Sequence, residues 1–398
     1  MAERPGARRA RLLVLGAGPA QLGLLEAVAR RADIETIAAD RDPRAPGFDF
    51  ADERAVVSSE DEEAVERLAR ARGVHGLISP GADWTVGVAA RVAERLELPH
   101  PIDAATAAVA VSKARQRDRL RAAGVPQPRL HGPDEPELSF PCVVKAPDRQ
   151  GQLGLSLVRA PDELPAALER ARAESRSGGV LVEELVEGPE LTVNGVWLDG
   201  SFVPLTVTDR LTAAAPAFGV ALAHVWPSAH ATPEAVSVAA AAACAVGIRN
   251  GPSYVQVRLG PEGPRVMEVA ARLGGGHDAE LCEAALGVDL NGLALGFALG
   301  RPVSPPGVHG RLGGACVRFL VAPQGVLRQV EGVEEALAVD GVRWARIYRR
   351  PGWRFGPLRR GADRAGAILA VGTSPEDALE RADRAAQAVR FQVDVDPT

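Results

Sequence analysis

The sequence is poor in cysteine, in long hydrophobic runs and in charge of one sign. Its 398 residues include four cysteines, far apart and without a CxxC motif, which argues against disulfides and a structural zinc site. The basic leader at residues 1–11 runs only into the short apolar stretch 12–15, so we expect neither a secretory signal nor a membrane-spanning helix. The net charge of −5 comes from interspersed acids and bases, so nucleic acid and membrane surfaces are not expected partners. We therefore expect a cytoplasmic protein.

Lysine is scarcer than cysteine. The chain has only two, Lys113 and Lys145, and its other basic residues are all arginine. Where arginine supplies the general charge, a position that keeps lysine is a candidate for a site that a planar guanidinium does not fit. Lysine offers a compact point charge suited to phosphate oxygens in a tight site. The alternative is that two lysines survived by chance, and their surroundings decide between these interpretations.

The opening of the chain has the pattern of a doubly wound α/β sheet. A chain of this length predicts roughly two to four domains. Residues 11–16 form an apolar strand, a turn leads into a helix, and residues 34–40 form a second strand that ends in an acid. The turn is close to a dinucleotide-binding GxGxxG motif, but Gln21 replaces the third glycine, so we reject NAD and FAD.

A strand and a small-residue loop follow in the next part of the chain. The strand at residues 140–145 ends on Lys145, and the loop after it contains Gln150, Gly151, Gly154 and Ser156. Such a loop between two strands can fold its backbone N–H groups around phosphate. A plain hairpin turn is the alternative, although it would need only one glycine.

The most informative stretch, residues 254–277, has the pattern of a hairpin. Alternating apolar and polar residues are followed by the turn Gly-Pro-Glu-Gly-Pro and a second strand. Such a pairing directs Gln256 and Glu268 from adjacent strands towards one point, with Arg272 and a run of glycines just beyond. Two oxygen ligands suit Mg²⁺, which takes the rest of its shell from phosphate and water. Alternatively, these side chains are simply the solvated face of the hairpin.

Taken in order, these pieces resemble the ATP-grasp superfamily over residues 11–300. The resemblance rests on a βα domain, Lys113, a strand ending on Lys145, a glycine loop, the motif EExxxGxE, and the hairpin with Gln256, Glu268 and Arg272. It implies a fold of mixed α/β and α+β class. The implied domains are an N-terminal doubly wound βα domain (1–110), a small lid domain with a linker helix (111–192), a large domain with a central antiparallel sheet (193–305) and a C-terminal α+β domain (306–398).

The same resemblance implies ATP as cofactor and Mg²⁺, or alternatively Mn²⁺, as metal. The two lysines fall on the family's phosphate-contacting lysines, the glycine loop on its flexible phosphate lid, and LVEELVEGPE on the hinge that holds adenine and ribose. The implied nucleotide contacts are Lys113, Lys145, Gln150, Gly151, Gly154, Ser156, Glu183, Glu184, Leu185, Val186 and Glu190. The implied metal ligands are Gln256 and Glu268.

Within the superfamily, the L-amino-acid ligase branch is similar to this chain in two respects. Many members carry Asn two residues after the metal-binding acid, whereas this chain has Ala270 there and keeps Arg272. Residues 313–398 also look like that branch's C-terminal domain, with FLVAPQGVLRQVEGVEEALAVDGV and GAILAVGTSPEDALERA. The likeness implies an ADP-forming ligase that joins small-molecule carboxylates and amines, amino acids among them, in an amide or peptide bond. It also implies a homodimer.

Three catalytic residues follow from the resemblance. Lys145 would neutralise charge while the γ-phosphoryl group passes to the carboxylate and forms an acyl phosphate. Arg272 would hold the carboxylate and then the tetrahedral oxyanion, or would instead form a structural bridge to an acid of the C-terminal domain. His277 would deprotonate the amine, unless it is a capping or packing residue.

Two other functions stay open at this point. A carboxyphosphate-forming enzyme of the same superfamily would use bicarbonate, and bicarbonate dependence of ATP turnover separates it from the ligase. An ATP-binding regulatory protein without turnover is the third hypothesis, because Gln256 stands where an acid is common and Ala270 where Asn is common. The sequence does not identify the two substrates, and residues 205–230, where pocket side chains are expected, have the pattern that is hardest to interpret.

Overall fold

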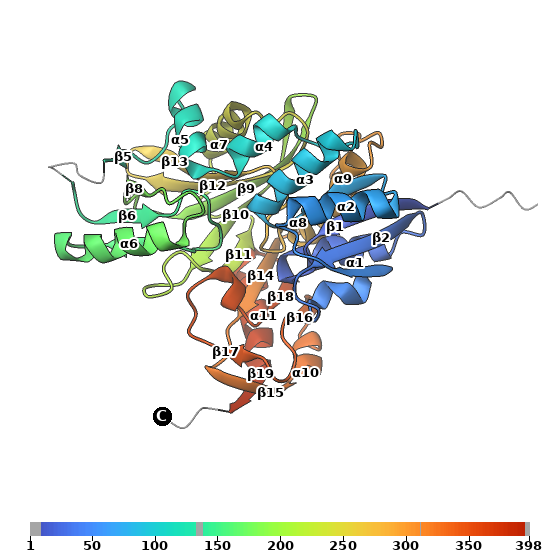
Figure 1. The fold of residues 1–398 in the computed structure, drawn as a ribbon. Coiled ribbons are helices and arrows are strands. Elements are labelled where there is room, and N and C mark those ends of the chain that lie inside the picture. The colour runs from blue at the N-terminus through green and yellow to red at the C-terminus, as the bar shows by residue number, and fades with distance from the viewer. Residues whose placement is uncertain (1–8, 133–137, 311, 395–398) are drawn as a thin grey trace, which may run out of the picture.

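The N-terminal part of the molecule is a parallel sheet with helices on both faces (Figure 1). The computed structural model describes residues 9–132, 138–310 and 312–394. The strand order is β3-β2-β1-β4, with β1 at Ala10–Leu15, β2 at Ile34–Asp40, β3 at Glu53–Val56 and β4 at Gly76–Ile78.

Strand β1 shows why this sheet is covered on two sides. Leu12 and Val14 pack with α1 (Leu22–Ala29) and α9 (Leu290–Ala298). Leu13 and Leu15 pack with α2 (Glu62–Arg72) and α3 (Asp83–Arg95). Successive strand side chains point to opposite faces, so a continuous apolar strand needs cover on both. The predicted doubly wound opening is confirmed. Asp40, the acid at the end of β2, stabilises the turn after β1 by accepting a hydrogen bond from the backbone N–H of Ala17 at 2.8 Å.

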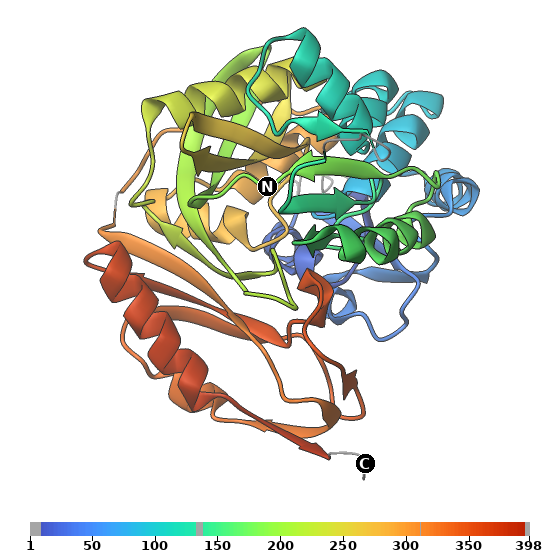
Figure 2. The same ribbon diagram turned by 90° about the vertical axis from the view of Figure 1, so that its left-hand side faces the viewer.

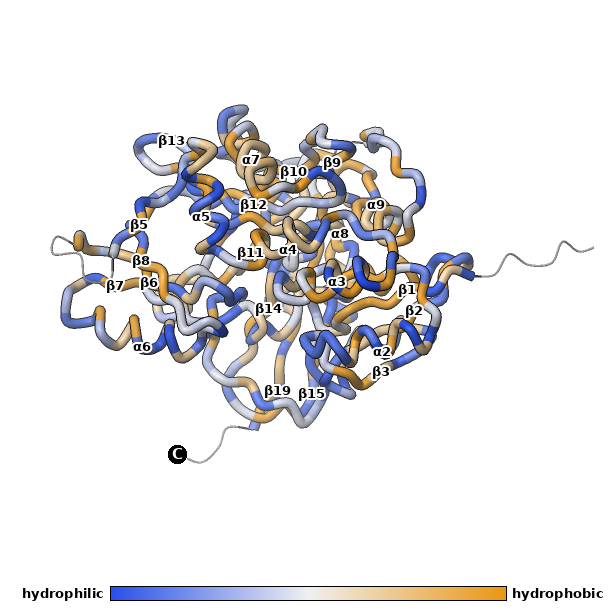
Figure 3. The backbone as a smooth tube through the Cα atoms, turned by 45° about the horizontal axis from the view of Figure 1, so that its top comes forward, coloured by the Kyte–Doolittle hydropathy of each residue, from blue (hydrophilic) through white to orange (hydrophobic). Residues whose placement is uncertain are grey.

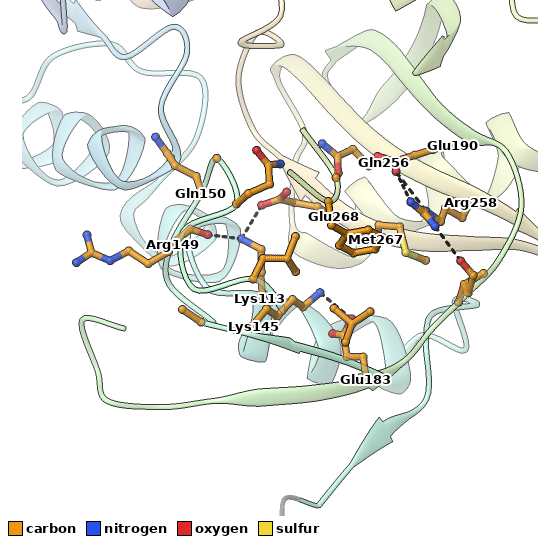
Figure 4. A pocket seen from close by; sticks show the side chains of 18 of the residues that line it. Lys113, Lys145, Arg149, Gln150, Glu183, Glu190, Gln256, Arg258, Met267 and Glu268 are labelled. Atoms are coloured by element: carbon orange, nitrogen blue, oxygen red, sulfur yellow. Dashed lines mark hydrogen bonds and ion pairs between the residues drawn. The ribbon is translucent and has the colours of Figure 1, made fainter. Parts of the chain in front are cut away.

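The small sheet that carries Lys145 has the strand order β5-β8-β6-β7. These strands are β5 (Leu130–His131), β6 (Cys142–Lys145), β7 (Ser156–Val158) and β8 (Leu181–Glu184). Cys142 and Val144 of β6 pack against α6 (Leu164–Glu174). Alternation along the strand therefore turns Lys145 to the other face, where it lines a cavity (Figure 4).

An eight-stranded antiparallel sheet forms the centre of the molecule, in the order β13-β12-β9-β10-β11-β14-β18-β16 (Figure 2). Its strands are β9 (Glu190–Leu198), β10 (Ser201–Thr212), β11 (Ala221–Trp226), β12 (Gly251–Gly260), β13 (Gly263–Ala270), β14 (Gly314–Leu320), β16 (Val342–Ile347) and β18 (Gly366–Gly372). The register of the predicted hairpin places Gln256 opposite Glu268. The stretch at 205–230 supplies most of β10 and all of β11.

The large sheet runs without a break into the C-terminal segment. Strand β11 pairs with β14, so residues on both sides of the boundary expected at 305–306 share one sheet. Helix α11 (Pro375–Ala388) packs on β14 and β18, and its buried alanines complete that layer. A second, three-stranded sheet contains β15 (Gly325–Glu331), β17 (Arg354–Phe355) and β19 (Arg390–Asp394), and α10 (Val333–Leu337) follows β15.

Helices cover the β12–β13 hairpin on the face away from the cavity. These are α4 (Ala104–Ala110), α5 (Lys113–Ala122) and the alanine-rich α7 (Pro233–Val246), whose small side chains lie close to the sheet. Helix α8 (Asp278–Leu286) follows the run of glycines after β13. Hydrophobic stretches along the chain are short and alternate with polar ones (Figure 3). Within the described residues, no helix combines the length and the apolar character that a membrane span requires.

Candidate active site

A cavity lies between the small sheet and the β12–β13 hairpin (Figure 4). Its walls come from the end of β6, the loop that follows it, the segment after β8, and the hairpin. The lining residues include Lys113, Lys145, Gln150, Gly151, Glu183, Glu184, Leu185, Val186, Glu190, Gln256 and Glu268. The structure thus brings together most of the residues that the sequence suggested for nucleotide and metal.

Lys113 connects α5, the loop after β6 and the hairpin. It is the first residue of α5, where the Ser112 hydroxyl caps the helix. Its Nζ lies 2.7 Å from Oε1 of Glu268 and donates to the carbonyl oxygen of Arg149 at 2.5 Å. Burial alone would raise the pKa of Glu268, but the charge of Lys113 and then that of Arg272 outweigh burial and lower it. Glu268 is therefore an anion at neutral pH.

Lys145 belongs to a buried triad with Glu183 and Arg117. The Lys145 Nζ lies 2.7 Å from one oxygen of Glu183, and the Arg117 Nε lies 2.8 Å from the other. Burial lowers the pKa of Lys145 to about 8, against the attraction of Glu183. For Glu183, Arg117 and Lys145 outweigh burial and hold the pKa at about 2. Both Glu183 oxygens face cations, so this residue holds Lys145 in place.

Arg117 is a site residue that the sequence analysis missed. Its side chain is 1% exposed, and it also donates to the carbonyl oxygens of Val266 at 3.2 Å and Met267 at 2.8 Å. One signal was available, because Arg117 lies four residues after Lys113 and hence on the same face of α5. The partner acid, 66 residues away, was not readable from that spacing.

Glu190 is held by two arginines that the sequence analysis did not pair with it. One oxygen lies 2.6 Å from Arg210, and the other lies 2.9 Å from Arg258. These contacts anchor the start of β9 to β10 and β12. Arg258 donates twice to its oxygen, whereas the oxygen that faces Arg210 keeps a second lone pair, so the predicted ribose contact is compatible with this arrangement.

The loop residues expected at the phosphates differ in their placement. Gln150 and Gly151 line the cavity, together with Gln152, Leu153 and Leu155. Gly154 is buried against Ala146 and Glu174, with φ at +70°, and does not line it. Ser156 begins β7, and its hydroxyl accepts a hydrogen bond from Arg170 at 3.0 Å, so it faces away from the cavity.

The two predicted metal ligands stand side by side on the hairpin. Gln256 donates from its amide nitrogen to the Tyr254 hydroxyl at 3.0 Å, which leaves its amide oxygen for a cation. Among the described residues, no group of three or more His, Cys, Asp and Glu is arranged to hold a metal. One carboxylate and one amide oxygen fit Mg²⁺, which completes its shell with phosphate and water.

Arg272 lines a second, adjoining cavity of about 420 Å³, a size suited to small molecules. Its Nε lies 2.6 Å from Asp83 at the start of α3. The bridge that the sequence analysis placed with a C-terminal acid is therefore made with the N-terminal domain. Gln256, Glu268 and Arg210 line both cavities, so the two meet at the hairpin and the loop after β6.

His277 does not line either cavity, in contrast to its predicted contact with the amine. Its Nδ1 lies 3.0 Å from Glu280, and its Nε2 lies 2.5 Å from the Tyr348 hydroxyl. The ring packs edge-on against Trp344, and burial lowers its pKa below the ordinary value. Both nitrogens are engaged and the ring is buried, an arrangement typical of the packing residue that was the alternative.

The second cavity contains further residues that the sequence did not single out. Tyr254 and Tyr348 line it, and so do Arg349 and Arg364 from the C-terminal segment. From the stretch 205–230, Arg210 and His224 line this cavity as well. Asp209 does not line it; it accepts a hydrogen bond from the backbone N–H of Ala229 at 2.9 Å and fixes the turn after β11.

Two family models match the chain. Residues 138–280 match the ATP-grasp domain, which covers the small sheet, the hinge and the hairpin. The chain therefore contains an ATP-grasp domain. Residues 318–394 match L-amino acid ligase C-terminal domain 2, so the ATP-grasp chain resembles the L-amino acid ligases in the segment that supplies Arg349 and Arg364.

Known proteins resemble this ATP-grasp chain along most of its length. The uncharacterised protein y4rH of Sinorhizobium fredii is 28% identical over 347 residues, which cover 82% of this chain and 70% of that protein. The formate-dependent phosphoribosylglycinamide formyltransferase of Burkholderia thailandensis is 28% identical over 421 residues, which cover 96% of this chain and 95% of that protein.

Solved structures share the fold. The L-amino acid ligase from Bacillus licheniformis superposes with a TM-score of 0.83 at 21% identity, over 98% of this chain and 100% of that one. The N5-carboxyaminoimidazole ribonucleotide synthetase from Thermotoga maritima gives a TM-score of 0.74 at 21% identity, over 97% of this chain and 100% of that one. The predicted ATP-grasp fold is therefore confirmed.

Proposed function

We propose that this protein is an ADP-forming carboxylate–amine ligase that makes an amide or peptide bond through an acyl phosphate. Its substrates are amino acids or related small carboxylates and amines. One observation carries the proposal. The cavity with both lysines opens at Glu268 and Gln256 into a second cavity that contains Arg272. A phosphoryl donor and an acceptor carboxylate can meet at that junction.

The first step needs neutralisation of crowded negative charge. A carboxylate oxygen attacks the γ-phosphorus of ATP, the bond from that phosphorus to the bridging oxygen breaks, and ADP leaves. Lys113 and Lys145 supply positive charge in the first cavity, and Arg272 in the second is placed to orient the carboxylate. The backbone of the loop at 150–153 contributes N–H groups and excludes water, which would hydrolyse the product.

The second step forms the new bond. The amine nitrogen attacks the acyl carbon, the bond from carbon to the phosphate oxygen breaks, and inorganic phosphate leaves with the electron pair. The amine proton passes to phosphate or water. Arg272 offers a planar fork for the tetrahedral oxyanion. His277 has no part in this step, because it is buried away from the cavity.

The residues present fit ATP with Mg²⁺, and Mn²⁺ would accept the same oxygen donors. Gln256 and Glu268 would hold the metal, and Lys113, Lys145 and the loop at 150–153 would hold the phosphates. The segment Glu184–Val186 would border the adenine, and Glu190 would reach the ribose. The bound metal supplies charge neutralisation at the β- and γ-phosphates.

The test is release of phosphate from Mg²⁺-ATP with a panel of carboxylates and amino acids, with hydroxylamine as a surrogate amine. Hydroxylamine intercepts acyl phosphates, so the true amine need not be known. We expect one carboxylate class to give phosphate and the matching hydroxamate in equal amounts. Lys145→Ala serves as the negative control, and it should abolish both products.

Two outcomes would overturn the proposal. Bicarbonate-dependent phosphate release without hydroxamate would indicate a carboxyphosphate-forming enzyme. Nucleotide binding without release under any condition would indicate a protein that has kept the nucleotide and lost the reaction. The homodimer and the cytoplasmic location expected from the sequence stay predictions, and sedimentation of the purified protein tests the first.

A further inference from the structure

The second cavity contains more positive charge than its own acids balance. Arg210 and Arg272 have carboxylate partners, Glu190 and Asp83. Arg349 and Arg364, in contrast, have no carboxylate within 4 Å among the residues that the structure describes. A buried or half-buried cation without a partner is costly, and proteins usually keep one where a ligand supplies the missing anion.

Arg364 is held in a fixed orientation without being neutralised. Its guanidinium carbon lies 3.6 Å from the centre of the Phe319 ring. Its Nε donates to the carbonyl oxygen of Gly361 at 2.7 Å, and one terminal nitrogen donates to that of Ala221 at 3.5 Å. Burial lowers the pKa of Arg364 below its ordinary value, which is what an unpaired, desolvated cation shows.

Arg349 repeats this arrangement nearby. Its guanidinium carbon lies 4.1 Å from the centre of the Trp353 ring, and one terminal nitrogen donates to the carbonyl oxygen of Ala362 at 2.9 Å. Both arginines therefore contact the same short loop, at Gly361 and Ala362. Ring and carbonyl contacts fix each guanidinium plane and leave N–H groups for a planar or tetrahedral anion.

The position of this arginine pair distinguishes it from the phosphoryl-transfer end of the site. Neither Arg349 nor Arg364 lines the first cavity, which contains the two lysines and would hold the nucleotide. Gln256 and Glu268 line both cavities. Tyr254 also lines the second cavity, and its ring centre lies 5.8 Å from the Arg272 guanidinium. A substrate group at the pair thus lies outside the cavity that contains the two lysines.

We infer that Arg364 and Arg349 bind an anionic group of the amine substrate and select amines that carry one. The anion is the free carboxylate of an amino acid or the phosphate of a phosphorylated amine. The inference rests on the proposed ligase function. The amine adds to the face of the acyl carbon, and its anionic group then needs a site outside the cavity that contains the two lysines; the arginine pair lines the second cavity only. The donor carboxylate already has Arg272 at the junction.

The first experiment uses the wild-type protein with its donor carboxylate and Mg²⁺-ATP. Product formation is compared for an amino acid, the corresponding amino acid amide, the corresponding decarboxylated amine, and phosphoethanolamine. We expect the neutralised and decarboxylated amines to have a kcat/KM lower by about 10- to 100-fold, the usual effect of losing a charge-assisted hydrogen bond. Preference for phosphoethanolamine over the amino acid would assign the site to phosphate.

The second experiment separates the amine from the donor. In Arg364→Gln and Arg349→Gln, we expect KM for the anionic amine to rise about 10- to 100-fold. The donor KM measured with hydroxylamine should stay unchanged. Arg350→Gln is the matched control, since Arg350 is adjacent, exposed and paired with Asp49 at 2.5 Å, outside the second cavity. Because two separate variants are measured, the test still works if one of them fails to fold.

Several results would overturn the inference. One is equal use of amino acids and their amides by the wild type. Another is a rise in the donor KM with hydroxylamine in both variants, which would move the arginine pair to the donor. If no donor gives a hydroxamate, the proposed function fails separately. Calorimetric titration of amino acids and phosphoethanolamine into wild type and Arg364→Gln then still tests the anion site, and equal binding by both proteins would rule it out.

Discussion

At the scale of single residues, the structure explains why lysine survives at two positions in an arginine-rich chain. Each lysine reaches a carboxylate at 2.7 Å, Glu268 for Lys113 and Glu183 for Lys145. Glu183 also receives Arg117, which uses its fork on that acid and on two backbone carbonyls. Arginine provides the rigid, buried support, and lysine provides the compact charge that faces the cavity.

The lowered pKa of Lys145 leads to a pH prediction. Burial brings that pKa to about 8, so in the nucleotide-free protein Lys145 loses its charge as the pH rises through that value. We expect kcat/KM for ATP, which reports the free enzyme, to fall above about pH 8. In Lys145→Arg the charge persists at high pH, so the residual activity should lose this alkaline decline. Identical profiles for both proteins would exclude Lys145 as the titrating group.

The hairpin acid gives a second prediction at this scale. Glu268→Gln keeps the shape of the side chain but removes the anionic oxygen that a cation needs. We expect the half-saturating Mg²⁺ concentration for phosphate release to rise about tenfold or more, since even outer-sphere changes have effects of 10- to 100-fold. Glu262→Gln is the control, because Glu262 lies in the turn of the same hairpin and is exposed. An unaltered magnesium requirement would place the metal elsewhere.

At the scale of elements, the loop between β6 and β7 is the part that would cover the phosphates in the proposed function. Three of its residues have left-handed backbone conformations: Gly151 at φ +63°, Gln152 at +68° and Gly154 at +70°. Gly154 is also surrounded, because an added Cβ would meet the Cβ of Ala146 at 3.0 Å. The two glycines thus allow left-handed backbone conformations within a close turn, whereas a plain hairpin turn would need only one glycine.

Gly151→Ala tests whether this backbone matters for nucleotide. The substitution meets no steric obstacle, because nothing lies within 4 Å of the added Cβ, but the left-handed conformation costs about 1–2 kcal/mol. We expect KM for ATP to rise about 5- to 30-fold as the loop leaves that conformation. Gly73→Ala is the matched control, with φ +55° and equally open space at the end of α2. It should lower stability and leave KM for ATP unchanged.

At the scale of the whole molecule, the C-terminal segment is continuous with the central sheet. Strand β14 extends the large sheet from β11, and Arg346 of β16 reaches back to the N-terminal half. Arg346 contacts Glu26 of α1 and Glu280 of α8, each at 2.5 Å. Glu280 also contacts His277, so the network joins N-terminal, central and C-terminal elements beside the second cavity.

Arg346→Met should therefore destabilise the whole molecule. Removing the cation leaves two largely buried carboxylates without their partner, which costs about 3–5 kcal/mol in comparable cases. We expect a clearly lower midpoint in urea unfolding. Arg350→Met, which breaks an exposed ion pair with Asp49, should cost less than about 1 kcal/mol. Equal effects of the two substitutions would show that the network does not link the three parts.

Sequence by itself determined the elements whose signal is local. The apolar run of β1 and the alternation of the hairpin were readable, because periodicity and turn residues act within about one element. The polar alternation on β12 and β13 was enough to pair Gln256 with Glu268. Rarity of lysine drew attention to two residues that both line the cavity.

Only the tertiary structure decided what long-range contacts do to individual side chains. It placed Glu183 between Arg117 and Lys145, joined Arg272 to Asp83, and buried His277 under Tyr348. It also turned residues 205–230 into β10 and β11, whose partners supply the order that their own sequence does not show. The reason is physical: an ion pair or a cavity depends on which distant segments meet, and no local pattern contains that information.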